Sequence, residues 1–139
     1  MTLVWLFDKK IMQYAFSKTL NEDYDQLIAR LEAALKAIGF GIVSTIKMDK
    51  TFKEKLGLDY KRYTILGACN PHFAIEALRL EEQLGVLLPC NVVIIDQGKG
   101  DVEAAAMDPA AMIKPLGNER LTEIAIEISE KLKTLIQEL

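Results

Sequence analysis

A four-residue turn between two strand-like runs constrains the fold of this chain more than any other feature of its sequence. The run over 91–96 is rich in β-branched residues and contains neither Gly nor Pro, and a second strand-like run spans 102–107. Gln97-Gly98-Lys99-Gly100 lies between them, and glycine supplies the left-handed backbone that tight turns need. The segment therefore predicts a β-hairpin, whose two strands are antiparallel.

Three further runs predict strands, over 14–19, 40–48 and 63–68. The last two follow one another without a long helical pattern between them. The intervening segment, 50–59, is strongly charged and predicts a short helical turn or loop that ends around Gly57. A second pair of antiparallel strands is therefore expected.

The first long helix is predicted after Asn21, a good N-cap residue, and Gly39 can supply its left-handed stop. Its apolar positions recur three and four residues apart, as one face of a helix requires. These positions are Tyr24, Leu27, Ile28, Leu31, Leu35 and Ile38.

A second helix is predicted from Asn70-Pro71, because Asn caps a helix and Pro is well suited to its first turn. It is expected to stop at Gly85. Its apolar residues are Phe73, Ala74, Ala77, Leu78 and Leu84.

Asp108-Pro109 predicts a short helix that ends near 115–117, and Asn118 caps the final helix. One face of that final helix is apolar over its whole length. The face consists of Leu121, Ile124, Ala125, Ile128, Leu132, Leu135, Ile136 and Leu139.

The element order is therefore β-α-β-β-α-β-β-α, which predicts an α+β fold. Strands that follow one another directly, and the lack of a glycine-rich phosphate loop after the first strand, disfavour a doubly wound parallel sheet. We expect a mostly antiparallel sheet of about five strands backed by helices. The 139 residues fit a single domain spanning 1–139.

Charge and hydropathy limit the kinds of partner that this chain is expected to bind. A formal net charge of −3 argues against nucleic acid, and the locally basic stretch over 47–62 is interpreted as a solvated surface. No run approaches the roughly 20 apolar residues that span a bilayer. The apolar start, Met1–Phe7, lacks the features of a signal peptide. We expect a cytoplasmic protein without a membrane partner, in which both cysteines are thiols.

The residues able to act as nucleophile, base or ligand lie close together in the sequence. Cys69 and Cys90 are the only cysteines and His72 is the only histidine, which makes these three the candidate catalytic residues. Cys69 precedes a helix N-terminus, where the thiolate is stabilised; the alternative is a buried structural cysteine. A Cys-His-Asn set occurs in cysteine-nucleophile enzymes, but only geometry identifies such a set.

A ligand site is predicted where the two strand–loop junctions meet. Cys69, Asn70, Cys90 and Asn91 form two Cys-Asn steps that bracket one helix, so we expect the two thiols to lie close together at one edge of the sheet. The first-turn amides favour an anion there, with Asn91 as a polar wall. No metal is predicted, since two cysteines and one histidine are too few for a structural zinc site.

A characteristic set of residues occupies the middle of the chain, at 63–71, Ala74, Ala77-Leu78, 85–93 and 107–109. In these residues the chain closely resembles the family known as domain of unknown function 302, and the similarity extends over about 14–139. The resemblance implies a small α+β fold with a helix-backed antiparallel sheet, a homodimer, and Cys69 and Cys90 as hallmark positions. It implies no activity and no cofactor, and the family motif does not fix the position of His72.

Three functions remain open. The first is a binding module for a small ligand or anion at the two-cysteine site. The second is a thiol-based redox protein or cysteine-nucleophile enzyme, and the third is a dimeric assembly protein with structural cysteines. A homodimer is also expected because Trp5, Leu6 and Phe7 are apolar and no helix is predicted to cover them.

Overall fold

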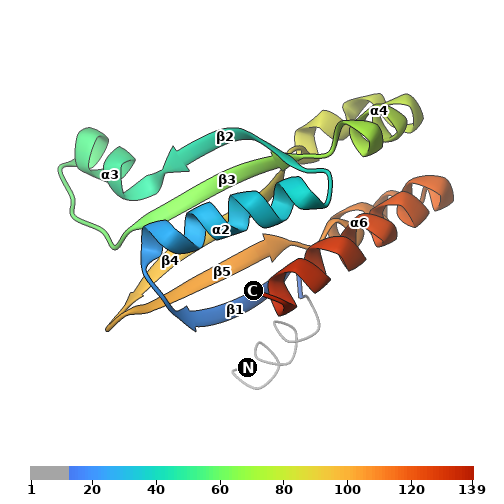
Figure 1. Cartoon of the computed structure of the whole chain (residues 1–139). Coiled ribbons are helices and arrows are strands. Elements are labelled where there is room, and N and C mark those ends of the chain that lie inside the picture. The colour runs from blue at the N-terminus through green and yellow to red at the C-terminus, as the bar shows by residue number, and fades with distance from the viewer. Residues whose placement is uncertain (1–12) are drawn as a thin grey trace, which may run out of the picture.

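Five strands form one sheet in which every neighbouring pair is antiparallel, and their order across the sheet is β1-β5-β4-β3-β2 (Figure 1). The structure is a computed structural model, and it describes residues 13–139. The strands are β1 (Ala15–Asn21), β2 (Gly41–Lys47), β3 (Tyr63–Cys69), β4 (Cys90–Gly98) and β5 (Asp101–Met107). The predicted α+β class and antiparallel sheet are confirmed.

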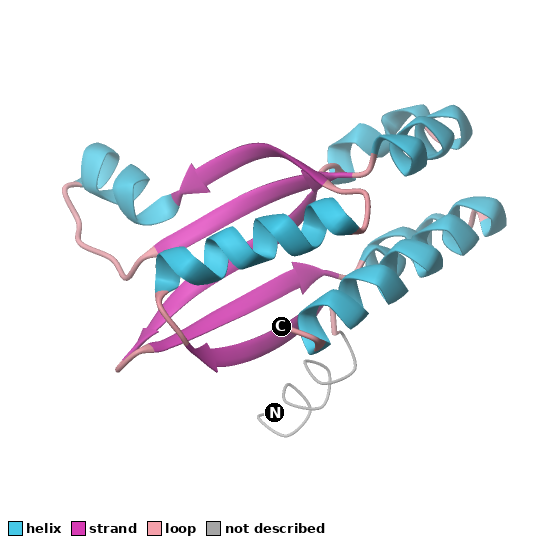
Figure 2. Ribbon diagram, viewed as in Figure 1, coloured by secondary structure: helices cyan, strands magenta, loops and turns pink. Residues whose placement is uncertain are grey.

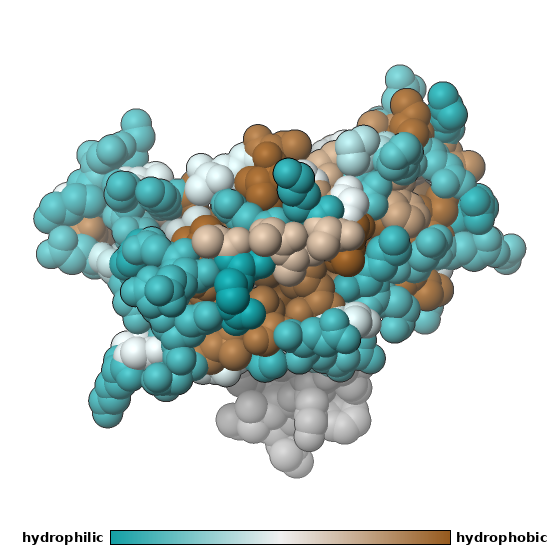
Figure 3. All heavy atoms as spheres, viewed as in Figure 1, coloured by the Kyte–Doolittle hydropathy of each residue, from teal (hydrophilic) through white to brown (hydrophobic). Residues whose placement is uncertain are grey.

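The helices follow the predicted order. They are α2 (Tyr24–Ala37), α3 (Met48–Leu56), α4 (Pro71–Leu80), α5 (Pro109–Ile113) and α6 (Glu119–Gln137), with two 3₁₀ turns, η1 (Glu82–Leu87) and η2 (Lys114–Leu116). The two long helices, α2 and α6, lie side by side on the same face of the sheet, whereas α4 extends beyond its end (Figure 2). This helical face is shown in space-filling form in Figure 3, where apolar residues lie between the polar outer surfaces of the helices.

The main core lies between the sheet and these two helices. Alternate strand residues point toward the helices and are buried, as the period of two in a strand requires. The sheet contributes Leu66, Ala68, Cys90, Val92, Ile94, Val102, Ala104 and Ala106, and the helices contribute Tyr24, Leu27, Leu31, Leu35, Ile128, Leu132, Leu135 and Ile136.

The predicted hairpin is present. Asp96 pairs with Val102 and Gly98 with Asp101, with an irregularity between them. Gly98, Lys99 and Gly100 all have positive φ, at 83°, 57° and 83°. Because this backbone region is readily available to glycine, the two glycines allow β4 to reverse into β5 within a few residues.

The predicted start of the first helix is wrong by two residues. Asp23 caps α2 by accepting a hydrogen bond from the Gln26 amide, at 3.0 Å. Asn21 instead ends β1, where it pairs with Asp101 and its amide donates to the Asp101 carboxylate. Strand pairing at this position therefore takes Asn21 out of the helix.

Of two further boundaries, one agrees with the prediction and one differs. The charged segment after β2 forms the helix α3, and Gly57 ends it with φ 67°, as expected. The helix that begins at Asn70 ends at Leu80, not at Gly85, because Glu81 is extended, with φ −146° and ψ 98°. The chain then continues as η1, which carries the buried residue Leu84.

Two expectations about partners concern the start of the chain and the membrane. Trp5, Leu6 and Phe7 lie outside the described residues. Within the part of the chain that the structure does describe, none of the helices is both long and apolar enough to cross a bilayer.

Candidate functional site

A cavity of about 60 Å³ lies at the end of the sheet, between α4 and α6. We call it the thiol cavity because both cysteines line it. Its remaining lining comes from the ends of β3 and β4, from α4, η1, α5 and α6, and is almost entirely apolar. The lining residues are Phe40, Ala68, Cys69, Asn70, Phe73, Ala74, Ala77, Leu84, Leu88, Pro89, Cys90, Pro109, Ile113, Leu121, Ile124, Ala125 and Ile128.

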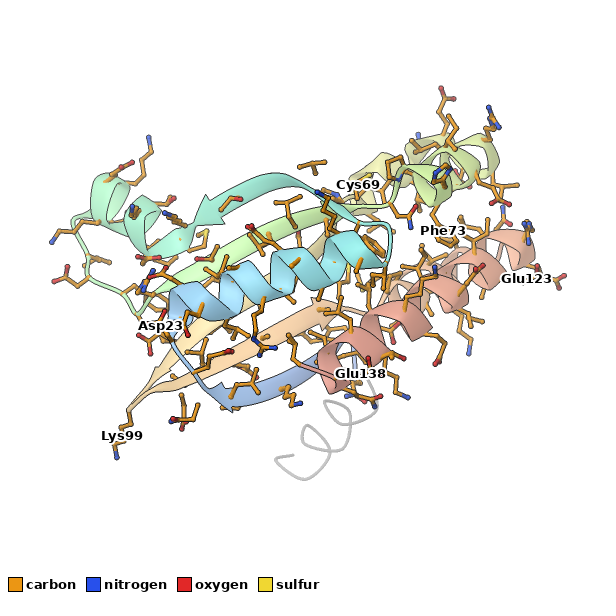
Figure 4. The ribbon with its side chains drawn as sticks, in the orientation of Figure 1. Asp23, Cys69, Phe73, Lys99, Glu123 and Glu138 are labelled. Carbon is orange, nitrogen blue, oxygen red and sulfur yellow. The ribbon has the colours of Figure 1, made fainter. Side chains whose placement is uncertain are left out.

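The strand register places the two cysteines on neighbouring strands at this end of the sheet. Cys90 pairs with Ala68 across β3 and β4, and Cys69 is the next residue along β3. From the usual strand spacing and rise, the Cα atoms of Cys69 and Cys90 are roughly 6 Å apart. Both are free cysteines, and Figure 4 places Cys69 where the strand gives way to α4.

The two thiols have different surroundings. Cys90 is only 8% exposed, whereas Cys69 is partly exposed. Burial raises the pKa of the Cys90 thiol to about 11, with a smaller contribution from the charge that Cys69 carries when ionised. Because that charge acts on Cys90, the two thiols are close enough to interact electrostatically. Cys90 therefore stays protonated at neutral pH.

Asn70 links the cavity to the start of α4. Its side-chain oxygen accepts a hydrogen bond from the Phe73 amide at 3.4 Å, which confirms the predicted cap. The residue is 9% exposed, and a β-carbon built on Gly39 would lie 3.1 Å from its amide nitrogen. The Asn70 side chain is thus held between the helix start and the turn that precedes β2.

The other two candidates lie elsewhere. His72 is exposed in the first turn of α4 and does not line the thiol cavity. Asn91 is exposed, pairs with Gly67 and points to the opposite face of the sheet from Cys90. The cavity therefore combines Cys69, Asn70 and Cys90, without the imidazole and the second amide.

The wall that α6 contributes is not evident from the sequence. Leu121, Ala125 and Ile128 line the cavity opposite Ala74 and Ala77 of α4. The small side chains on the two helices leave the space that larger ones would fill. The sequence shows that α6 has an apolar face that includes Ala125. It does not show which helix packs against that face, because this is set only when the chain folds.

Two surface interactions connect α4 and α6 around the cavity. Arg120 of α6 forms an ion pair with Glu76 of α4. One turn earlier in α4 is Phe73, which is labelled in Figure 4. The ammonium nitrogen of Lys131 in α6 lies over its ring, 5.8 Å from the ring centre. The Arg120–Glu76 ion pair is largely exposed and contributes little stability, whereas Phe73 is half-buried and also lines the thiol cavity.

The described residues contain no group of three or more His, Cys, Asp or Glu side chains placed to hold a metal ion. The polar groups of the thiol cavity are two thiols and one amide. With so few oxygen and nitrogen ligands, its chemistry is that of an apolar pocket with two soft sulfur atoms.

Fold and cavity together define a small α+β protein with a helix-backed antiparallel sheet. The model of the family described as "Domain of unknown function DUF302" matches residues 16–139, and the chain belongs to this family. The structure is similar to the crystal structure of an uncharacterized conserved DUF302 protein from Bacillus stearothermophilus, with a TM-score of 0.82 and 28% sequence identity. That match covers 90% of this chain and 97% of the other. No curated protein matches the chain.

Proposed function

We propose that this chain binds a small, largely apolar molecule in the thiol cavity. The observation that carries the proposal is that both cysteines line one otherwise apolar cavity between α4 and α6. A water molecule needs about 10–15 Å³ of such space, so 60 Å³ suits a ligand group of about four to six non-hydrogen atoms.

The lining favours an apolar group over a free anion. Asn70 already caps the Phe73 amide, and the Ala74 amide is bonded to the Asn70 carbonyl. The amides at the start of α4 are therefore largely occupied, and the cavity walls offer no positive side chain. An anionic end of a ligand would sit at the exposed rim near Cys69, with the apolar part inside.

Short ligands of equal chain length test this proposal. We expect n-butanol, and more weakly butyrate, to shift the amide NMR signals of cavity residues such as Ala77 and Ala125 in a saturable way. Tighter binding of butyrate would favour the anion alternative at the same site. The absence of saturable shifts with either ligand would reject a ligand cavity.

A cavity-filling variant supplies the control. Ala125→Phe places a ring in the thiol cavity and should abolish the shifts, whereas Ala33→Phe adds the same ring at an exposed position of α2. Ala74→Leu is a smaller filling substitution, useful if Ala125→Phe unfolds the protein. Equal binding by the filled and control variants would place the ligand elsewhere.

Thiol chemistry at Cys69 is the second candidate function. It is favoured by a partly exposed cysteine beside a second, protonated thiol in the same cavity. Two free thiols also suit a reducing compartment, and we propose a cytoplasmic location for the protein. Oxidation with diamide, followed by mass spectrometry, tests the pair: loss of two mass units and a peptide linked between Cys69 and Cys90 support a redox role, and unreacted thiols oppose it.

We also propose that the chain forms a homodimer. The supporting observation is the sheet face opposite α2 and α6, where apolar side chains remain partly exposed. Light scattering at micromolar concentration should give twice the chain mass of 15.6 kDa. A mass of one chain would reject the dimer without affecting the ligand proposal.

A further inference from the structure

A groove of about 560 Å³ lies between the second half of α2 and the C-terminal half of α6, and we call it the helix groove. Figure 3 shows apolar residues between these two helices. The buried side chain of Leu135 and the half-buried Ala34 belong to the groove lining. The exposed charged residues Arg30, Lys131 and Glu138 also line it. The groove is therefore apolar inside and charged at its sides.

The helix groove and the thiol cavity are consecutive along α6. Ile128 lines the cavity, and Lys131, three residues later, lines the groove. Residues three apart are neighbours on the surface of a helix. The turn after α2 provides a second link, because Ile38 lines the groove and Phe40 lines the cavity. A molecule held in the thiol cavity therefore has the groove beside it.

Phe73 and Lys131 lie where the two spaces adjoin. Phe73 is half-buried and lines the cavity, and the Lys131 ammonium nitrogen lies 5.8 Å from the centre of its ring. Figure 4 shows Phe73 on the side of α4 that faces α6. Within residues 13–139, Lys131 forms no ion pair with a carboxylate. A positive charge is thus available directly outside an apolar cavity.

The other charged groups of the groove do not compete for this position. Arg30 is held by both carboxylate oxygens of Glu22, at 2.8 and 2.9 Å. Glu130 and Glu138 line the groove as well, but neither is paired with Lys131. The anion-binding group at the cavity is therefore a single ammonium group, which suits a ligand with one negative charge.

We infer that the thiol cavity takes an unbranched aliphatic carboxylate of medium chain length, whose tail enters the cavity past Phe73 and whose carboxylate pairs with Lys131. This inference rests on the proposed function and names its ligand class. The cavity walls carry no cation, so the charged end remains outside. The rim near Cys69 continues along the first turn of α4 to Phe73, where Lys131 supplies the missing positive charge.

The dimensions set a minimum chain length. The cavity of about 60 Å³ holds about four to six non-hydrogen atoms. Further carbon atoms are needed to pass the Phe73 ring, because carbon atoms in contact stay about 3.5–4.0 Å apart. Butyrate is too short to fill the cavity and reach Lys131 at once, so its charge is left without a partner. The chain of n-octanoate is long enough for both contacts.

The first experiment tests the carboxylate position. Amide NMR titrations of wild type and Lys131→Gln with n-octanoate should show an increase of about two- to fivefold in the dissociation constant, as expected for a partly exposed ion pair. The dissociation constants of n-octanol and butyrate should not change. Lys133→Gln is the matched control, because it removes the same charge from an exposed α6 residue that does not line the groove. Equal weakening of n-octanoate in both variants would overturn the inference.

The second experiment tests the sign of the charge. In wild type, n-octylamine should bind more weakly than n-octanoate, because Lys131 repels its ammonium group. Lys131→Glu should reverse this order while leaving the affinity for n-octanol unchanged. An unchanged order in Lys131→Glu would show that the charged end lies elsewhere.

The NMR signals that shift separate this inference from the proposed function. We expect n-octanoate to shift the Ala77 and Ala125 amides, which report on the cavity. Shifts confined to Ala34 and Ala37 would place the chain in the helix groove and overturn the inference. If n-octanol binds in the cavity but Lys131→Gln leaves n-octanoate binding unchanged, the carboxylate position is wrong and the ligand cavity stands. If neither ligand shifts the cavity amides, both proposals fail.

Discussion

Ser44 and Gly67 face each other across β2 and β3, and the Ser44 hydroxyl occupies the place where a side chain at 67 would begin. A β-carbon built on Gly67 would lie 2.2 Å from the Ser44 Oγ and 2.8 Å from the Pro89 Cγ. The pairing is also the point where β2 is irregular, between Ile42 and Ser44. Glycine at 67 therefore allows three segments to meet beside the thiol cavity.

Replacing Gly67 with alanine should destabilise the protein. The added methyl group collides with a side chain on each side, and such overpacking typically costs about 1–3 kcal/mol. Gly41→Ala is the control, because a β-carbon there has no atom within 4 Å. Urea denaturation of both variants measures the difference; a Gly67→Ala protein as stable as Gly41→Ala would show that Ser44 and Pro89 move aside freely.

A buried hydroxyl pair under α2 gives the next prediction. The Tyr24 hydroxyl donates to the Ile94 carbonyl at 3.0 Å and shares a 2.7 Å hydrogen bond with the Thr64 hydroxyl. Tyr24→Phe removes these bonds and leaves Thr64 buried without its partner. We expect a loss of about 1–3 kcal/mol in the free energy of unfolding.

The double variant Tyr24→Phe/Thr64→Val tests the coupling. If the Tyr24–Thr64 bond matters, the double variant should lose less stability than the sum of the two single variants. Strict additivity in chemical denaturation would contradict the coupling.

Local sequence signals predicted most of the elements, because their causes lie within a few residues. The hairpin follows from Gly98 and Gly100, and the start of α4 follows from Asn70-Pro71. The predicted helix boundaries are wrong where contacts with residues distant in the sequence outweigh the local preference of a residue. Asn21 is a good helix cap by itself, but its pairing with Asp101, eighty positions away, extends β1 through it.

The candidate site was predictable only in part for the same reason. Cys69 and Cys90 could be assigned to one end of the sheet because a strand-helix-strand segment returns near its start. The side of the sheet that each residue faces depends on register, which separates Asn91 from Cys90. The part of the cavity lining that α6 contributes, around Ala125, depends on how α6 packs against α4, and these helices are far apart in the sequence.

The cap of α4 is a separate test of the site. Asn70→Ala removes the oxygen that accepts from the Phe73 amide and should lower stability by about 1 kcal/mol or somewhat more, since Asn70 is also buried. Asn70→Asp keeps the acceptor and should recover most of the loss. Asn118→Ala removes the equivalent cap of α6, 3.1 Å from the Leu121 amide, and provides the comparison.

If the proposed ligand contacts this end of the cavity, Asn70→Ala should also weaken binding of n-butanol, while Asn118→Ala should not. Amide NMR titrations of the two variants measure this. Equal affinities in both variants would make Asn70 a purely structural residue.

The last prediction concerns the two thiols. Because Cys90 is buried and its pKa is raised to about 11, it should resist iodoacetamide in the folded protein at pH 8, whereas the partly exposed Cys69 should react. Mass spectrometry of the digested protein identifies which cysteine is modified. Faster labelling of Cys90 than of Cys69 would mean that the cavity opens readily from the Cys90 side.

The same pKa makes stability depend on pH in a defined direction. The ordinary pKa of the thiol is 9.0, so between about pH 9 and 11 the unfolded chain releases a proton that the folded chain retains. The contribution of Cys90 is therefore fully present below pH 9 and is lost as the pH rises toward 11, by about 3 kcal/mol in all. Cys90→Ala should lack this slope, and Cys69→Ala should largely keep it. Urea denaturation of the three proteins from pH 8 to 11 isolates the effect from every other group, because the three proteins share all of them. A wild type and a Cys90→Ala variant with parallel pH profiles would contradict the predicted contribution of Cys90.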